Sequence, residues 1–380
     1  MKNSIPAIMV AMCAGIACAA QVPAFKIPER FKDHPLFTTR HCSVNFGFLA
    51  RRGYFSRPEI FAQAARIKAA GANWVTLNTH FCQEKFYSTK TFLDFDWSSG
   101  EVELEAMIKE LHRQGLHILL KPCITTLDSS WMGRVSFPEK TEEQIQGVHN
   151  TYWTDWFNSL RECLTYFGQI AERNGVEAMM IGAEYTGTLG QGDEWRKTAA
   201  HVRKVYSGPI SYEFTPQDHK RFGLEWFEVL DFLSYSTYPA GVKKPRNRKE
   251  WAKMEPVRFE EMMEALAPVR EEVAALSKRF GNKPIVFTEI GTRSCRGCVN
   301  LPWEYLNLSP WDGEEQANYM EAVFRTMSGL PCWLGLSWWK WDETQKNRPH
   351  FHVDPLKDRG FTIDGKPASA VLKRWAEKGL

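Results

Sequence analysis

The stretch Lys283-Pro284-Ile285-Val286-Phe287-Thr288-Glu289-Ile290-Gly291 gives the clearest indication of how this chain folds. The four apolar or β-branched residues before Glu289 are typical of a short buried strand. Glu289 follows where that strand should end, and Gly291 allows the backbone to turn. The same pattern occurs earlier in the chain, at Val176-Glu177-Ala178-Met179-Met180-Ile181-Gly182-Ala183-Glu184. Packing alone does not require a carboxylate at the end of either strand.

Patterns typical of strands and helices alternate along the whole chain. The expected strands are Cys42–Phe48, Trp74–Asn78, His117–Pro122, Ala178–Glu184, Ile210–Phe214, Phe232–Thr237, Ile285–Glu289 and Leu334–Trp339. The expected helices are Pro58–Ala70, Glu101–Gln114, Thr151–Asn174, Phe259–Phe280 and Glu314–Ser328. This alternation predicts an α/β protein with a single (β/α)8 TIM barrel. A doubly wound sheet is the alternative, but residues 47–53 lack the G-x-G-x-x-G pattern of a nucleotide-binding turn.

The barrel has a consequence for Glu184 and Glu289. Active sites of such barrels lie at the carboxyl ends of the strands, so both side chains should face the same mouth. One glutamate at a strand end is most often a solvated residue or half of an ion pair. Two of them suit the cleavage of a glycosidic bond, which needs one acid to protonate the leaving oxygen and one carboxylate to attack the sugar carbon.

The first twenty residues resemble an export signal. Lys2 precedes an apolar stretch from Ile5 to Ala17, and small residues follow. We therefore expect a signal peptide at 1–20, a catalytic domain at 21–380, and a secreted or periplasmic protein. A lipoprotein anchor at Cys18 is the alternative, although Gly15 stands where leucine is usual. No later segment is apolar enough to cross a bilayer.

The composition narrows the choice of partners. The formal net charge is +3, which favours neither nucleic acid nor an acidic membrane surface. The 15 tryptophans and 24 phenylalanines are compatible with sugar stacking as well as with a core. Seven cysteines follow residue 20, too scattered for a disulfide framework. A disulfide between Cys295 and Cys298 is the expected exception, while zinc ligation there is disfavoured because no second pair lies at the required spacing.

Seven segments in order resemble glycoside hydrolase family 113, whose characterised members are mainly β-mannanases of the large retaining clan with (β/α)8 barrels. The matching segments are Leu119–Pro122, Trp131–Val135, Ile181–Thr188, Glu194–Arg196, Tyr238–Pro239, Phe287–Ser294 and Trp339–Trp341. The resemblance implies that Glu184 is the acid/base and Glu289 the nucleophile. Retention then requires the two carboxyl groups to lie roughly 5–5.5 Å apart, and their environments should drive their pKa values apart.

The resemblance also bears on the residues around the two glutamates. Many members of the clan have asparagine before the acid/base, where this chain has Ala183, and histidine is common where it has Cys123. A tyrosine such as Tyr238 can hydrogen-bond the nucleophile, or it can simply form a Tyr-Pro turn. Trp339 and Trp341 share one face of a strand. Trp339, nearer the strand end, is expected to line the sugar site, although the pair could also only plug the barrel.

Four more polar or aromatic side chains fall near the predicted mouth. Asn78, His80 and Lys121 are expected to hydrogen-bond sugar hydroxyls, and Trp131 to stack on a neighbouring sugar. Structural or solvated roles are the alternatives for each of them. Arg293 could pair with a carboxylate near Glu289.

The sequence therefore predicts a secreted retaining glycoside hydrolase, with endo-β-1,4-mannanase activity favoured by the family resemblance. A hydrolase of another β-glycan is the first alternative, and a non-catalytic carbohydrate-binding barrel is the second. Too few histidines stand at the strand ends to suggest metal-dependent hydrolysis. We expect a poly- or oligosaccharide substrate, no cofactor, no metal, no nucleic acid, no membrane span and a monomeric state.

Overall fold

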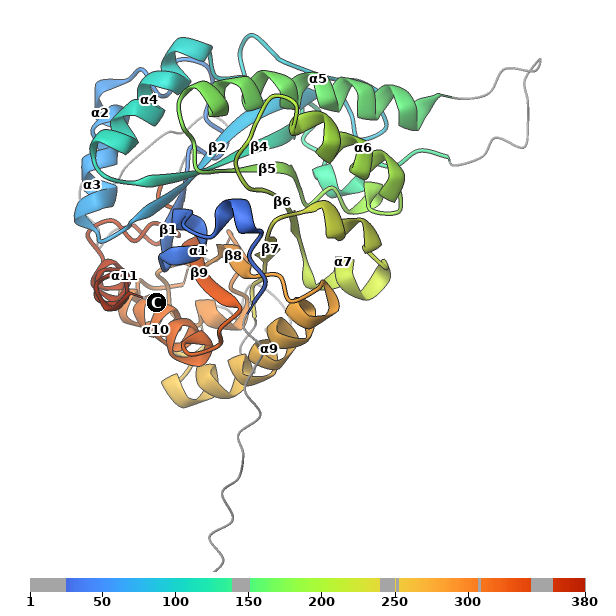
Figure 1. Cartoon of the computed structure of the whole chain (residues 1–380). Helices are drawn as coiled ribbons and strands as arrows, with labels where there is room; N and C mark the ends of the chain where they lie inside the picture. The colour runs from blue at the N-terminus through green and yellow to red at the C-terminus, as the bar shows by residue number, and fades with distance from the viewer. Residues whose placement is uncertain are drawn as a thin grey trace, which may run out of the picture.

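The computed structural model describes residues 25–138, 151–239, 250, 253–306, 309–342 and 358–379. Their sheet has nine strands, of which all but β3 are parallel and close into a ring (Figure 1). The parallel strands are β1 (His41–Phe46), β2 (Trp74–Gln83), β4 (His117–Thr126), β5 (Ala178–Ala183), β6 (Ile210–Phe214), β7 (Leu233–Ser236), β8 (Ile285–Ile290) and β9 (Trp333–Trp338). The short β3 (Thr91–Phe92) pairs antiparallel with the end of β2. The predicted (β/α)8 barrel is confirmed.

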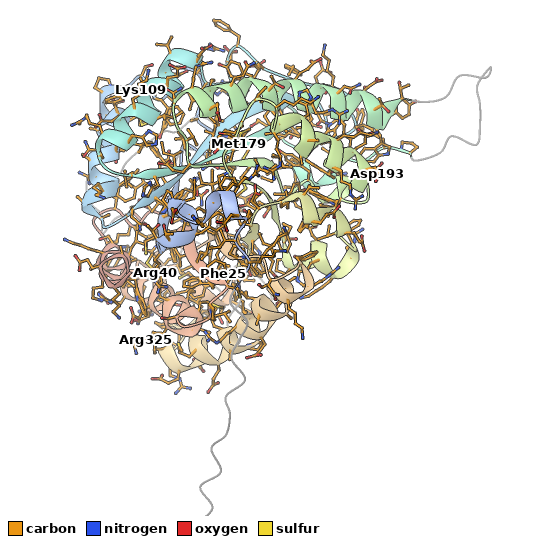
Figure 2. All side chains as sticks on the ribbon, in the orientation of Figure 1. Phe25, Arg40, Lys109, Met179, Asp193 and Arg325 are labelled. Atoms are coloured by element: carbon orange, nitrogen blue, oxygen red, sulfur yellow. The ribbon has the colours of Figure 1, made fainter. Side chains whose placement is uncertain are left out.

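Helices surround this ring and connect successive strands (Figure 1). They are α2 (Pro58–Phe61), α3 (Gln63–Ala69), α4 (Glu101–Arg113), α5 (Tyr152–Arg173), α6 (Gly192–Val202), α7 (Pro216–Arg221), α9 (Phe259–Arg279), α10 (Gly313–Met327) and α11 (Pro367–Lys378). Side chains fill the space between helices and strands, whereas Lys109 and Arg325 lie on outer faces (Figure 2). None of the described helices is long and apolar enough to span a bilayer.

Helix starts follow from local chemistry. At the start of α4, Glu103 accepts hydrogen bonds from the backbone N–H groups of Gly100 and Gly53, at 2.7 and 2.9 Å. At the start of α10, Asp312 accepts from the N–H of Glu315 at 2.9 Å. The bonds from Gly100 and Glu315 satisfy donors at the starts of these helices, and the bond from Gly53 connects the loop after β1 to α4.

The bottom of the barrel interior is apolar. Inward-facing side chains from five strands and from the residue just before β7 form one cluster there, namely Trp74, Leu119, Ala178, Met180, Phe232, Val286 and Leu334. The segment before β1 closes this end with Phe31 from a 3-10 turn (η1, Glu29–Phe31) and with Leu36 and Phe37 from α1 (Pro35–Thr38). Each of these three side chains gains about 1.5–3 kcal/mol by burial. The N-terminal segment therefore acts as a plug.

Above this layer the barrel interior is polar. The Asn45 amide donates to the carbonyl of Thr288 at 2.9 Å and to the Ser337 hydroxyl at 3.1 Å. Across the barrel, the hydroxyl of Ser234 donates to that of Ser211 at 2.9 Å. Such groups are tolerated in a buried interior because they bond one another. The polarity of the interior therefore increases from the plug toward the mouth.

Pairing between strands shifts register close to the two predicted catalytic residues. The β5–β6 register shifts between Met180 and Ala183, just before Glu184. The β7–β8 register shifts so that Ser236 pairs with Glu289. Irregularities of this kind redirect side chains and are over-represented beside active sites.

The predicted strands and helices are present with small changes in their ends. The largest change is in β2 and β4, which continue to Gln83 and Thr126 because their ladder runs without interruption from the Trp74–His117 pair to the Gln83–Thr126 pair. The expected helix at 58–70 is divided at Ala62. The sequence interpretation missed α6, α7, α11 and β3. The proposed signal peptide, with Cys18, lies outside the described residues.

The cysteines are all free and buried among the described residues. This agrees with the expectation for Cys42, Cys82, Cys123 and Cys332, but the disulfide expected between Cys295 and Cys298 is absent. The two thiols are instead joined by a hydrogen bond. Cys298 starts a 3-10 turn after Gly297, whose φ of 71° lets the chain turn there.

His41 is an unusual inward-facing residue at the bottom of β1. Its ring stacks on Trp74 with 4.6 Å between centroids, and neither ring nitrogen has a hydrogen-bond partner among the described residues. Burial, with a smaller contribution from the nearby His117, lowers the pKa of His41 from 6.5 to about 3. The ring is therefore neutral in the folded protein at physiological pH.

This burial predicts a pH-dependent stability. Because the pKa of His41 is about 3 when folded and 6.5 when exposed, the unfolded chain binds more protons between these values. The free energy of unfolding should therefore fall as the pH decreases through this window, by at most ~1.4 kcal/mol per pH unit. His41→Leu should make this decrease less steep, as measured by urea unfolding across the window.

A matched control is His201→Leu, which changes a partly buried histidine of α6 that bonds Thr165. The control should alter the slope less than His41→Leu does. Equal slopes for wild type and His41→Leu would show that His41 titrates normally in the folded barrel.

Candidate active site

Glu184 follows directly after β5 at the mouth of the barrel. Its φ is 56°, a left-handed conformation that is uncommon for a residue with a side chain and costs about 1–2 kcal/mol. The backbone N–H of Glu184 donates to the carbonyl of Glu213 at 2.9 Å, which fixes the turn. The hydroxyl of Ser236, on β7, hydrogen-bonds to the Glu184 carboxyl.

Glu289 lies near the end of β8, and its carboxylate accepts two hydrogen bonds. The Tyr238 hydroxyl donates to one oxygen at 2.8 Å, and the Lys121 ammonium donates to the other at 3.0 Å. The hydrogen bond from Tyr238 that the family resemblance implied is therefore present. The side chain of Glu289 is only 15% exposed. The two donors hold the carboxylate from two sides and fix its orientation.

A third glutamate, Glu213 on β6, completes the group. It is fully buried, accepts from the Thr288 hydroxyl at 2.7 Å, and forms an ion pair with Lys121 at 2.5 Å. Sequence reasoning missed Glu213 because it lies inside an expected strand rather than at its end. An acid between Tyr212 and Phe214 in a buried strand was the available signal, since a buried carboxylate needs a cation nearby.

The three carboxylates converge. Glu184, Glu213 and Glu289 each have one carboxyl oxygen that lies within 4.8 Å of the corresponding oxygens of the other two. Burial, followed by the charges of Glu289 and Glu213, raises the pKa of Glu184 from 4.5 to about 8. Glu184 therefore holds a proton near neutral pH.

Lys121 is the cation at this convergence. Burial alone would lower the pKa of Lys121, but the charges of Glu213 and Glu289 outweigh it and raise the pKa well above 10.5. The ammonium lies 2.5 Å from Glu213 and 3.0 Å from Glu289, where it supplies the positive charge that a metal ion would bring. This arrangement favours the expectation of a metal-free site.

Trp339 is an aromatic side chain beside Lys121. It is partly exposed, and its ring centroid lies 5.7 Å from the Lys121 ammonium and 4.6 Å from the Phe48 ring. Trp341 is fully buried and donates from its indole nitrogen to Gln63 at 3.1 Å. Of the two predicted tryptophans, only Trp339 is available to a ligand, and Trp341 packs in the core.

Asn78 and His80 lie deeper than the sequence suggested. Both are fully buried, because β2 continues past them. The Asn78 amide donates to Asn45 and to backbone carbonyls. The His80 ring accepts from the N–H of Leu49 at 2.8 Å and bonds Thr125 at 3.0 Å. Their polar atoms are thus engaged within the protein, which favours a supporting role over direct contact with sugar.

The remaining predicted residues have different surroundings. Trp131 is 50% exposed in the loop after β4, so it is free to stack on a ligand. Lys121, expected to bind hydroxyls, is instead bound to two carboxylates. Arg293 donates to the carbonyls of Arg359 and Tyr305. Within the described part of the chain, the guanidinium of Arg293 is therefore bound by backbone carbonyls and not by a carboxylate.

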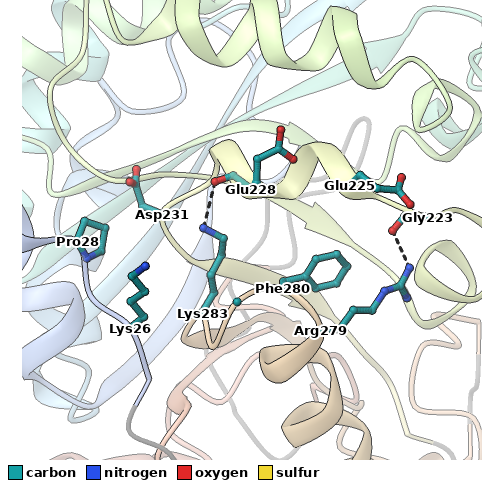
Figure 3. Close-up of a pocket in the computed structure, with 10 residues that line it drawn as sticks. Lys26, Pro28, Gly223, Glu225, Glu228, Asp231, Arg279, Phe280 and Lys283 are labelled. Atoms are coloured by element: carbon teal, nitrogen blue, oxygen red, sulfur yellow. Dashed lines mark hydrogen bonds between the residues drawn. The ribbon is translucent and has the colours of Figure 1, made fainter.

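A cavity of about 640 Å³ lies elsewhere (Figure 3). Its lining includes Lys26 from the N-terminal segment, Asp231 just before β7, and Lys283 just before β8. These positions are at the amino ends of the strands, opposite the mouth. Lys283 already donates to the carbonyls of Glu228 and Leu230. This cavity is therefore separate from the group around Glu184 and Glu289.

The sequence of this chain matches one known protein family over most of its length. The model of Glycoside Hydrolase Family 113 matches residues 44–366, which include all the strands except the start of β1. This chain belongs to glycoside hydrolase family 113. It is thus a glycoside hydrolase, as the sequence resemblance predicted. No match is found among curated proteins.

Solved structures agree with this family assignment. The chain is similar to the family 113 β-mannanase AaManA from Alicyclobacillus acidocaldarius in complex with ManMIm, at 25% identity and a TM-score of 0.72, over 90% of this chain and 99% of that one. A family 113 β-1,4-mannanase complex has 22% identity and a TM-score of 0.72, over 89% and 99%. A family 5 mannosidase from Rhizomucor miehei has 12% identity and a TM-score of 0.56, over 89% and 92%. The last two likenesses establish only the shared fold.

The ion pairs of Lys121 predict a large effect on the stability of this family 113 hydrolase. Lys121→Met would leave Glu213 and Glu289 without their buried cation. We expect the free energy of unfolding to fall by about 3–5 kcal/mol at neutral pH, because removing one partner strands a buried charge. Urea unfolding would measure this loss.

The double variant Lys121→Met with Glu213→Gln should recover part of the lost free energy of unfolding, because one of the two carboxylates left without a cation is also neutralised. The matched control is Lys109→Met, which breaks an exposed pair with Glu105 at 3.4 Å and should change stability by less than about 0.5 kcal/mol. If Lys121→Met were no less stable than this control, the buried pairs would contribute nothing.

Proposed function

We propose that this family 113 hydrolase is a retaining endo-β-1,4-mannanase in which Glu184 is the acid/base and Glu289 the nucleophile. The observation that carries the proposal is the approach of the two carboxyl groups at the barrel mouth, with oxygens within 4.8 Å of each other. A retaining enzyme needs its carboxyl groups roughly 5–5.5 Å apart, whereas an inverting enzyme leaves roughly 6.5–9.5 Å for a water molecule.

The surroundings of the two residues support this division of roles. The raised pKa of Glu184, about 8, keeps the proton that a general acid must donate. Glu289 accepts from Tyr238 and Lys121, which stabilise its carboxylate and orient it for attack. Two carboxyl groups whose environments differ in this way can take the two roles.

The reaction then follows two displacements. Glu289 attacks the anomeric carbon while Glu184 gives its proton to the glycosidic oxygen, so the bond to the leaving sugar breaks and a glycosyl–Glu289 ester forms. Glu184, now ionised, takes a proton from water, and that water displaces Glu289 from the anomeric carbon. The second inversion restores the original configuration, and Glu184 regains its proton.

The substrate is inferred from similarity and from the aromatic residues of the mouth. Two family 113 structures similar to this chain are named β-mannanases. Trp339 is partly exposed beside Lys121, and Trp131 is exposed in the neighbouring loop, so both could stack on sugar rings. Ala183 favours the alternative of another β-glycan, because many clan members have an amide at this position and the methyl group of alanine cannot bond the 2-hydroxyl.

The remaining expectations form part of the same proposal. We propose that residues 1–20 are a signal peptide, that 21–380 form the catalytic domain, and that the mature protein is secreted or periplasmic and monomeric. Hydrolysis of an external polysaccharide would be consistent with export.

The catalytic pair can be tested by removing each carboxyl group. Glu184→Ala and Glu289→Ala should each lower turnover on manno-oligosaccharides by several orders of magnitude. Sodium azide should restore activity to Glu289→Ala and give a glycosyl azide of inverted configuration, because the small anion replaces the lost nucleophile. Product configuration can be followed by NMR.

Circular dichroism should show both variants folded. A suitable control is Glu103→Ala, which removes a buried carboxylate that caps α4 and accepts from the backbone N–H groups of Gly100 and Gly53. Near wild-type turnover in either active-site variant would exclude that residue from the mechanism.

The substrate can be tested with a panel of polysaccharides. We expect cleavage of β-1,4-mannan into mixed oligosaccharides, and much weaker action on β-1,4-glucan, xylan and galactan. A site that hydrogen-bonds a particular hydroxyl can discriminate by up to about 10⁴-fold against a sugar that lacks the contact. Chromatography of the products by size would give both the preferred glycan and the endo mode. Equal or faster cleavage of glucan would overturn the mannan assignment and leave the two-glutamate mechanism in place.

A further inference from the structure

Glu213 is a buried carboxylate at the mouth that the two-glutamate mechanism does not use. It is 0% exposed and is held by Thr288 at 2.7 Å and by Lys121 at 2.5 Å. Burying a charge without function would be costly, even when it is paired. The position of Glu213, within 4.8 Å of oxygens of both Glu184 and Glu289, indicates what it could do.

We propose that Glu213 is a positioning residue of this active site: its carboxylate holds the ammonium of Lys121 against Glu289 and places a second negative charge beside Glu184. This proposal rests on the function proposed above. It assigns Glu213 no contact with substrate, because Glu213 is fully buried.

The first part of the argument concerns Lys121. Its flexible side chain reaches from β4 to Glu289 on β8, and Glu213 on β6 binds the same ammonium from another side. A lysine held by one carboxylate could pivot, whereas two carboxylates and the ring of Trp339, 5.7 Å away, restrict it. Thr288, adjacent to Glu289 in the same strand, fixes Glu213 in turn. The nucleophile and its cation are thus linked through Glu213.

The second part concerns the proton on Glu184. Charged or titratable groups face Glu184 from every strand around it: Lys121 and Cys123 on β4, Tyr212 and Glu213 on β6, Tyr238 after β7, and Glu289 on β8. Lys121 favours ionisation of Glu184, while Glu213 and Glu289 oppose it. If Glu289 is ionised for attack, Lys121 alone would offset its charge. Burial and the charge of Glu289 contribute most to the raised pKa of Glu184, and the carboxylate of Glu213 adds to them. Burial raises the pKa of Glu213 as well, but Lys121 and the Thr288 hydroxyl act in the opposite direction and favour its ionised form.

Glu213→Gln is the decisive variant. Glutamine has the same shape and can still accept from Lys121, so it removes the charge but keeps the contact. With one negative charge fewer, the pKa of Glu184 should fall below its value of about 8. A single like charge at this range is worth about one pH unit or more. The alkaline limb of kcat/KM on manno-oligosaccharides should therefore move to lower pH by about that amount.

A second measurement does not depend on substrate. In protein labelled with ¹³C at the glutamate side-chain carboxyl carbon, NMR follows the titration of Glu184, with Glu184→Gln identifying its signal. The same downward shift is expected in Glu213→Gln. Thr288→Val keeps the charge of Glu213 but removes a hydrogen bond to it, so it should lower kcat while leaving the Glu184 titration close to that of wild type.

Glu103→Gln is the matched control. This buried carboxylate caps α4 and bonds the backbone of Gly100 and Gly53 rather than Lys121 or Glu289, so the variant should lower stability and leave the pH profile unchanged. Unchanged titration of Glu184 and an unchanged alkaline limb in Glu213→Gln would overturn the positioning proposal, even with full mannanase activity. A shifted NMR titration in a protein that cleaves no glycan would instead support the charge coupling and overturn the proposed function.

Discussion

The ammonium group of Lys121 lies where buried carboxylates from two strands meet, 2.5 Å from Glu213 and 3.0 Å from Glu289. The carboxyl groups of Glu184, Glu213 and Glu289 have oxygens within 4.8 Å of one another. They could not all remain ionised without a cation, because like charges in a poorly solvated site repel strongly. One lysine offsets part of that repulsion and leaves the rest to act on Glu184. Strand register, hydrogen bonds and side-chain packing around the mouth keep one lysine and three carboxyl groups in contact, so negative groups outnumber positive ones there.

The barrel interior provides a graded environment for that charge. At the bottom, the plug of Phe31, Leu36 and Phe37 excludes water from an apolar layer. Hydroxyl and amide groups occupy the next layer, and their hydrogen bonds make a buried charge above them tolerable. The side chains proposed to carry the chemistry then project from strand ends, which are better fixed than long loops. The apolar bottom of the barrel thus contributes mainly to stability, and the polar mouth holds the candidate active site.

Much of this arrangement could be predicted from the sequence. The residues that were missed or misplaced have physical reasons for it. Strand periodicity predicted the fold, and acids at two strand ends identified Glu184 and Glu289. The same reasoning missed Glu213, because an acid inside an apolar strand gives no sign of what faces it from the next strands. It also placed Asn78 and His80 too near solvent, because the sequence pattern did not reveal that β2 and β4 continue together for several more residues.

The left-handed backbone of Glu184 has an evolutionary consequence. A glycine or asparagine at this position would adopt a φ of 56° more readily, and either residue would also remove a buried carboxyl group whose ionisation the neighbouring charges oppose. If Glu184 has the role proposed for it, the most stable sequence for this barrel differs from the active one. Selection for stability alone would favour replacement of Glu184, whereas its proposed catalytic role would explain why a glutamate is kept in this left-handed conformation.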